Sequence, residues 1–157
     1  MIAVSSVLDR LAVQIATVFG LGRAPLAPGT VASVVTVVFL GLVPFSRAGL
    51  VLFLLVVVVV GTWAAHRAEG VIGGKDPGAI VIDEVAGMTL SVVAFPLTPE
   101  VLAAGLALFR VFDVWKPPPA RESQRITGGL GVMIDDLIAG LYALAVIALS
   151  RPLLGWP

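Results

Sequence analysis

The stretch "MIDDLIAGLYALAVIALS", Met133–Ser150, decides the fold class. From Leu137 onward it carries no charged residue and is apolar enough for a helix in a membrane. Two adjacent carboxylates, Asp135 and Asp136, stand just before that run. Ionised carboxylates are costly at membrane depth unless they face a cavity and find a partner. The rest of the chain must therefore supply a cavity and a partner for these carboxylates.

Composition places the chain among membrane proteins. Hydrophobic residues make up 59% of its 157 residues and charged residues only 13%, with a mean hydropathy of +1.07. A soluble domain is usually about a quarter charged, so this chain has too little polar surface to hide its apolar side chains from water. The length fits a single domain over residues 1–157. We therefore expect an all-α integral membrane helical bundle.

The same composition argues against several classes of function. The net charge is zero and the ten basic residues are scattered, which argues against a nucleic-acid partner. The sequence has no cysteine, so thiol nucleophiles, disulfides and thiolate metal sites are excluded. His66 is the one histidine, which excludes any mechanism that needs two.

Apolar runs separated by turn residues predict five membrane helices. A helix needs about 20 apolar residues to cross a bilayer core. The runs are residues 24–46, 48–65, 79–97, 99–115 and 132–150. A polar loop rich in proline and glycine, residues 116–131, precedes the last run.

Residues 1–20 carry an amphipathic pattern. Apolar residues recur at helical spacing from Val4 to Phe19, and polar residues such as Asp9 and Arg10 occupy the other face. This pattern is typical of a helix that lies on the membrane surface, and also of an ordinary helix packed on the protein body. The bundle we expect includes it as an N-terminal amphipathic interfacial helix.

The basic residues predict an orientation. With five spans alternating across the membrane, eight of the ten bases fall on or near one side. They are Arg10, Arg23, Arg67, Lys75, Arg110, Lys116, Arg121 and Arg125. Arg47 and Arg151 fall on the other side. Because loops rich in lysine and arginine stay in the cytoplasm, we expect the N-terminus and the two polar loops there.

Polar residues within the expected spans fall at one depth. Thr30, Glu84, Asp113 and Asp136 lie 12 to 14 residues from the outer breaks of their helices. At ~1.5 Å per residue these separations are all roughly 18–21 Å. The side chains therefore form one layer near the cytoplasmic boundary of the hydrocarbon.

This layer has more acids than bases. Its acids are Asp83, Glu84, Asp113, Asp135 and Asp136, and the bases nearby are Lys75, Arg110 and Lys116. A divalent cation would relieve the repulsion, and oxygen ligands suit Mg²⁺. The bases, and the free N–H groups of the helix opened by "PGT", residues 28–30, suit a phosphate.

Each feature alone has a purely structural explanation. Either acid pair could favour a helix N-terminus. Arg110 and Asp113 could form an ion pair on one helix face. The glycines of "GGLG", residues 128–131, could form a hinge, or could let the backbone approach a ligand. The gathering of the acids at one level favours a functional site.

Four blocks of the sequence resemble a known family. "PLAPGTVAS", "KDPGAIVIDEVAGM", "FRVFDVWKPPP" and "GGLGVMIDDLIAG" occur in order between residues 20 and 140. In order and spacing they are similar to the signature blocks of phosphatidylglycerophosphatase A. The resemblance covers most of the chain, and four ordered blocks are more specific than any single motif.

The resemblance implies a Mg²⁺-dependent lipid phosphatase of the bacterial inner membrane. Such an enzyme removes the terminal phosphate of phosphatidylglycerophosphate to give phosphatidylglycerol, a step of phospholipid biosynthesis on the cytoplasmic leaflet. The orientation expected from the basic residues places the acidic layer on that side. Ala32 in the first block, and Ala120 and Gln124 after the third, depart from the family pattern, which would affect the rim of the site.

The matching positions imply roles for individual residues. The expected catalytic residues are Asp83, Glu84, Asp113, Asp135 and Asp136, and Mg²⁺ is expected on some of Asp83, Glu84, Asp135 and Asp136. The expected phosphate-binding residues are Gly29, Thr30, Lys75, Arg110, Lys116 and Arg125. Asp113 is a candidate base or second ligand. A metal-oriented water could attack the phosphorus, or an aspartate could attack it to form an acyl phosphate.

Two other classes of function compete with this interpretation. A small ion-coupled transporter would also place acids in a membrane, but its acids are expected at the midplane. A non-catalytic scaffold could use the glycine-rich helix faces for association, and it would leave the clustered acids unexplained.

Overall fold

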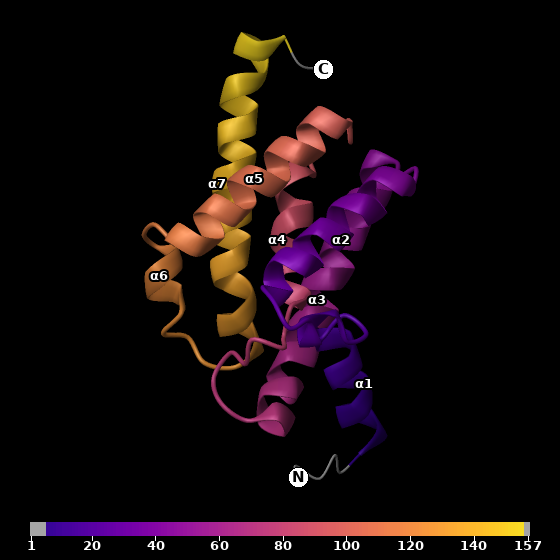
Figure 1. The fold of residues 1–157 in the computed structure, drawn as a ribbon, viewed down its shortest axis with the longest axis vertical. Coiled ribbons are helices and arrows are strands. Elements are labelled where there is room, and N and C mark those ends of the chain that lie inside the picture. Colours follow the sequence, from indigo (N-terminus) through magenta and orange to yellow (C-terminus); the bar gives the residue numbers. More distant parts are fainter. Residues whose placement is uncertain (1–5, 156–157) are drawn as a thin grey trace.

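The computed structural model describes residues 6–155, and every regular element in that range is helical (Figure 1). The elements are α1 (Val7–Ala16), the 3₁₀ helix η1 (Leu21–Arg23), α2 (Pro28–Leu42), α3 (Arg47–Ile72), α4 (Ile82–Val92), α5 (Pro99–Trp115), α6 (Ala120–Ser123) and α7 (Gly129–Leu154). The all-α class expected from the sequence is confirmed. The short helix α6 lies inside the segment that we expected to be only a loop.

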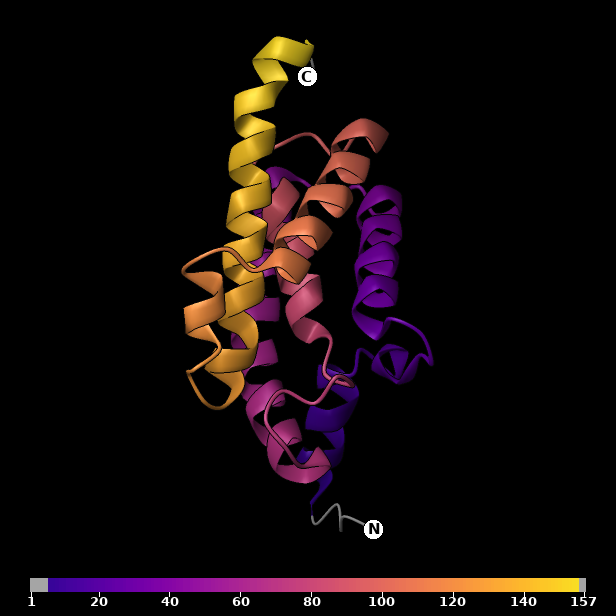
Figure 2. The same cartoon turned by 60° about the vertical axis from the view of Figure 1, so that its left-hand side comes forward.

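Helix α4 is the centre of the bundle. It contacts α2, α3, α5 and α7, and nine of its residues are buried (Figure 2). It is 11 residues long and shorter than the expected run 79–97. Residues 79–81 precede it without being helical: the Ile80 N–H donates to the Pro77 carbonyl in a turn, and the Val81 N–H donates to the Ala16 carbonyl at 2.9 Å. Residues 93–98 form the turn to α5, so the apolar run is longer than the helix within it.

Two helices are long and apolar enough to cross a membrane. Helices α3 and α7 each have 26 residues, with mean hydropathies of 2.6 and 2.1 over their most apolar windows. At ~1.5 Å per residue each spans about 39 Å. Helices α2 and α5 have only 15 and 17 residues. The expected five membrane helices are therefore not confirmed. Two of the five, α3 and α7, are long and apolar enough to cross a membrane.

Large apolar side chains on the outside of the bundle indicate a membrane protein. On α2, Val38 is 53% and Leu42 is 78% exposed. On α3, Leu52 is 62% and Val59 is 70% exposed, and on α7 Leu149 is 76% exposed. Contiguous apolar surface of this kind is costly in water and is the normal outer surface of a membrane helix.

Helix α1 packs against α3 through its small residues. Ala12 and Ala16 are fully buried, and Asp9 forms an ion pair with Arg67 at 2.7 Å. The large residues of α1, Val7, Leu8 and Leu11, are at least half exposed. The helix thus packs on the protein body and also presents an apolar face outward, so its interfacial position stays a prediction. Val4, which belongs to the same pattern, lies outside the described residues.

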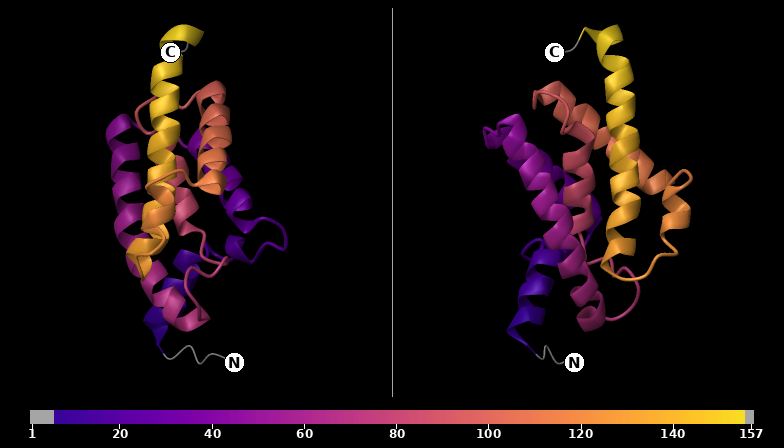
Figure 3. Two further views of the ribbon diagram at one scale, coloured as in Figure 1. Left: turned by 90° about the vertical axis from the view of Figure 1, so that its left-hand side faces the viewer. Right: turned by 180° about the vertical axis from the view of Figure 1, so that it is seen from behind.

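The two ends of the bundle carry different loops. The start of α1, the loop 73–81 and the loop 124–128 lie at one end (Figures 1 and 3). The turn 43–46, the turn 93–98 and the end of α7 lie at the other. This distribution agrees with the sorting of loops from the basic residues.

Helices α4 and α7 approach closely at two glycines. A Cβ on Gly140 would stand 2.5 Å from the Gly87 carbonyl oxygen. A Cβ on Gly87 would stand 2.4 Å from the Phe109 ring and 2.6 Å from the Asp136 carbonyl oxygen. Only glycine permits this close approach. The contact therefore sets the spacing between α4, which carries Asp83 and Glu84, and α7, which carries Asp135 and Asp136.

We predict that Gly140→Ala destabilises the protein by about 1–3 kcal/mol, because the methyl group would push backbone against backbone. Thermal unfolding in detergent measures the effect. Gly70→Ala is the matched control, since nothing lies within 4 Å of a Cβ at Gly70 in α3, and alanine favours a helix. Equal melting temperatures for the two variants would contradict this account of the α4–α7 contact.

Candidate active site

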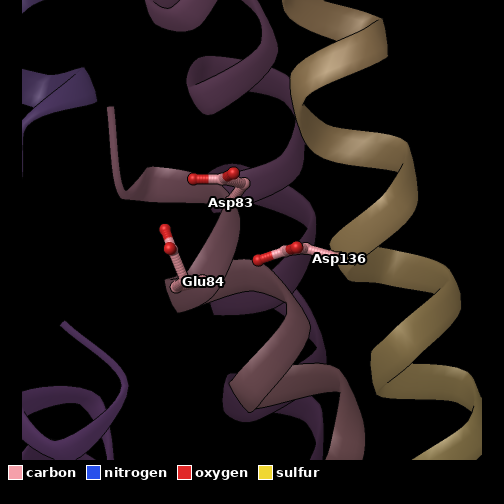
Figure 4. Close-up of side chains that lie close together, drawn as sticks. All are labelled: Asp83, Glu84 and Asp136. Atoms are coloured by element: carbon pink, nitrogen blue, oxygen red, sulfur yellow. The ribbon is translucent and has the colours of Figure 1, made fainter. Parts of the chain in front are cut away.

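Three carboxylates from two helices converge in the bundle. Asp83 and Glu84 stand in the first turn of α4, and Asp136 comes from α7. Each offers one carboxylate oxygen, and these oxygens lie within 4.8 Å of one another. Figure 4 shows the three side chains pointing toward a common space. Asp136 lies about two turns inside α7, because that helix begins at Gly129 and not at residue 132 as expected.

Two cations from α5 stand beside these acids. The Arg110 guanidinium donates to Asp113 Oδ2 at 2.5 Å. Lys116 Nζ donates to Asp113 Oδ1 at 3.0 Å and to Asp135 Oδ2 at 2.7 Å, and it lies 3.7 Å from Asp136 Oδ1. Lys116 caps α5 in a left-handed conformation, φ 47°, which turns its side chain toward α7.

Neighbouring carboxylates keep the Lys116 side chain protonated. Partial burial lowers the pKa of Lys116, but the carboxylates of Asp136, Asp135 and Asp113 outweigh this effect and hold that pKa above its usual value. Lys116 is therefore a permanent cation at neutral pH. One ammonium group is shared among three carboxylates, so it neutralises only part of the cluster.

The acids and bases line one pocket of about 270 Å³. Its wall on the α2 side consists of Ala27, Pro28 and Gly29. The first N–H groups of a helix have no partner within it, so this wall suits an anion. A Cβ on Gly29 would stand 2.0 Å from Glu84 Oε1 and 3.3 Å from Arg110 Nη1. Glycine at this position therefore lets α2 approach the site.

Several oxygens in the pocket have no hydrogen-bond partner among residues 6–155. They are Asp83 Oδ1, Glu84 Oε2, Asp135 Oδ1 and Asp136 Oδ2, all buried. An unsatisfied buried carboxylate oxygen is costly. Because three of these oxygens belong to the converging acids, the residues present fit a hard divalent cation such as Mg²⁺.

Three expected phosphate-binding residues do not line this pocket. Thr30 and Arg125 are exposed, and neither is part of its wall. Lys75 is also exposed, and its ammonium donates to the Gln124 carbonyl at the side of a neighbouring hollow. The structure brings Gly29, Arg110 and Lys116 into the pocket together with all five acids.

One residue of the pocket, Asp76, was missed from the sequence, and Gln124, expected only to affect the rim, contacts an acid of the site. Asp76 lines the pocket from the loop before α4, with a left-handed φ of 46°. Gln124 donates to Asp135 Oδ2 at 3.2 Å. Asp76 lies within the quoted block "KDPGAIVIDEVAGM", so an acid in the same block as Asp83 was the available signal.

The glycines at the start of α7 serve helix packing. A Cβ on Gly129 would stand 1.9 Å from the Thr62 carbonyl oxygen, and one on Gly128 would stand 2.7 Å from His66 Nδ1. They let the start of α7 lie directly on α3. These positions therefore fix the height of Asp135 and Asp136 in the bundle, and neither glycine lines the acidic pocket.

Comparison with known proteins decides the family. The profile described as phosphatidylglycerophosphatase A matches residues 14–151. The chain belongs to this family. Membership makes it a phosphatase, and the four sequence blocks that suggested the resemblance all lie within the matched range.

Three curated relatives support this assignment. The phosphatidylglycerophosphatases A of Escherichia coli and Haemophilus influenzae are 36% and 35% identical over 132 and 134 residues, and each alignment covers 82% of this chain, with 77% and 82% of the relative. A putative phosphatidylinositol-3-phosphatase of Bacteroides thetaiotaomicron is 38% identical over 154 residues, covering 92% of this chain and 96% of the relative. No solved structure matches the chain significantly.

We predict that Lys116→Met destabilises the protein by about 1–3 kcal/mol in the presence of EDTA, because it leaves buried carboxylates without their cation. The pKa of Lys116 is higher in the folded than in the unfolded chain, so the stabilisation is complete at neutral pH and is lost only at strongly alkaline pH. Chemical denaturation at pH 7 measures the effect. Lys75→Met is the control, since Lys75 is exposed and bonds only a backbone carbonyl. An equal loss in both variants would contradict the role given to Lys116.

Proposed function

We propose that this chain is a Mg²⁺-dependent lipid phosphatase that hydrolyses phosphatidylglycerophosphate to phosphatidylglycerol and phosphate. The observation that carries the proposal is the convergence of Asp83, Glu84 and Asp136 on one space, with unpartnered oxygens beside Arg110 and Lys116. The family, and the two relatives that bear its name, supply the substrate. The site is proposed to open to the cytoplasmic leaflet of the bacterial inner membrane.

The acidic and the basic residues of the pocket have different proposed roles. Asp83, Glu84 and Asp136 would hold Mg²⁺, which supplies a polarised phosphate oxygen and an acidified water. Arg110 and Lys116 would face the non-bridging oxygens of the phosphate and stabilise the charge of the transition state. The start of α2 at Gly29 would add N–H donors to the same anion.

Asp113 is better placed to position cations than to act as a base. Its two oxygens already accept hydrogen bonds from Arg110 and Lys116. Asp135 keeps a free Oδ1 in the same pocket, and we propose that this oxygen accepts the proton of the attacking water. The water oxygen bonds to phosphorus, the ester P–O bond breaks, and the departing glycerol oxygen takes up a proton.

A second lipid, with a different head group, should be tested in the same phosphate-release assay. The Bacteroides relative is named for phosphatidylinositol 3-phosphate, and it covers nearly the whole chain. Both lipids present a phosphomonoester to the pocket, so the acidic site alone does not separate them. Parallel assays with the two lipids in mixed micelles decide between them, and we expect the higher kcat/KM for phosphatidylglycerophosphate.

We predict that Asp136→Asn lowers phosphate release at least 100-fold while the protein stays folded, because one of three metal-binding carboxylates is lost. Wild-type protein is expected to be active with Mg²⁺ and inactive with EDTA. Asp9→Asn is the matched control, because Asp9 pairs with Arg67 in the α1–α3 contact and lies outside the pocket. Wild-type rates in Asp136→Asn would remove this residue from the site. Absence of turnover by the wild type with Mg²⁺ would favour a transporter or a scaffold.

We also predict the orientation of the two ends. The natural sequence has no cysteine, so single cysteines report their own accessibility. In intact cells an impermeant thiol reagent is expected to label Ser46→Cys, in the turn before α3, and to spare Lys75→Cys in the loop before α4. In inverted vesicles the labelling should reverse. Labelling of Lys75→Cys in intact cells would place the acidic pocket on the outer side.

A further inference from the structure

A second pocket, of about 320 Å³, lies between α2 and α3. Its lining is almost wholly apolar, in contrast to the acidic pocket. Helices α2 and α3 both pack against α4, and Ile82 and Val85 of α4 form the floor. We call this space the α2–α3 groove.

The α2–α3 groove and the acidic pocket share no lining residue, but their walls follow one another along α2 and α4. Ile82 in its floor is the neighbour of Asp83, and Ala32 in its wall stands one turn after Gly29. From Ala32 the wall continues along one face of α2 to Phe39, a distance of about 10 Å. The groove therefore runs along α2 from about one turn beyond Gly29 toward the opposite end of the bundle.

Two aromatic side chains close the far end. Phe39 of α2 and Phe53 of α3 lie with ring centroids 5.5 Å apart, and both line the groove. Its side remains open, because Val35 is 42% and Phe39 is 41% exposed on the apolar outside of α2. An occupant can thus enter sideways from the hydrocarbon region.

The mouth of the groove is formed by a strained turn. Val18 and Phe19 line it in left-handed conformations, with φ of 46° and 55°. A left-handed conformation is rare for a β-branched residue and persists only where the surroundings impose it. The turn leaves Phe19 82% exposed beside the groove. An aromatic ring held at this place suits the boundary between head groups and acyl chains.

We infer that the α2–α3 groove receives an acyl chain of the lipid whose phosphate enters the acidic pocket. A polar or charged occupant is excluded by the lining, and the position of the groove beside the acidic pocket fits a molecule that carries a phosphate at one end and a hydrocarbon chain at the other. Moving the chain from bilayer to groove exchanges one apolar medium for another, so the groove adds little affinity. Its effect is to align the head group with the reacting groups, where small displacements are costly.

This inference rests on the proposed function, and it can fail separately from it. The test fills the groove with Val35→Trp and compares two substrates in detergent micelles. One is long-chain phosphatidylglycerophosphate, and the other is its deacylated, water-soluble head group. Val34→Trp is the matched control, because Val34 is equally exposed on α2, at 42%, and does not line the groove.

For Val35→Trp we expect the ratio of kcat/KM for the long-chain substrate to that for the deacylated substrate to fall about tenfold. Val34→Trp should keep the wild-type ratio. Should Val35→Trp fold poorly, Val35→Phe should lower the ratio in the same direction but less. An unchanged ratio in the folded Val35 variants, or an equal fall in Val34→Trp, overturns the inference and leaves the phosphatase intact. Absence of phosphate release from both substrates by the wild type overturns the proposed function, and the inference with it.

Discussion

The mutual repulsion of buried carboxylates is the constraint on which the rest of the structure depends. Asp83, Asp113, Asp135 and Asp136 are each less than a tenth exposed, and Glu84 joins them in one pocket. Desolvated carboxylates stay ionised only with compensating cations, and otherwise take up protons. Lys116 and Arg110 provide part of this compensation, and the unpartnered oxygens lie where we propose that a divalent cation binds.

The fold can be understood as the means of bringing these acids together. Glycines at the α4–α7 contact let the two acid-bearing helices approach, and Gly128 and Gly129 set α7 directly on α3. Gly29 admits the start of α2 beside Glu84 and Arg110. The chain therefore uses glycine where three helices must approach the site closely, and apolar side chains elsewhere on its surface.

The sequence was sufficient to predict the all-α class and the gathering of the acids, because both follow from helical rise and from the cost of charge in an apolar medium. It was not sufficient for α4, since an apolar run does not reveal where a turn such as that of residues 77–80 gives way to helix. Asp76 was missed because its place in the pocket depends on a left-handed loop conformation. The α2–α3 groove arises from how two helices meet a third, which no local pattern encodes.

The central claim is that Asp83, Glu84 and Asp136 together bind one divalent cation. Mn²⁺ prefers the same oxygen ligands as Mg²⁺ and is visible by electron paramagnetic resonance. Titration of the detergent-solubilised protein with Mn²⁺ measures binding without turnover. The account predicts one bound Mn²⁺ per chain in the wild type, displaced by excess Mg²⁺ and weakened at least tenfold by Glu84→Gln. Failure of the wild type to bind Mn²⁺, or equal binding by Glu84→Gln, would contradict it.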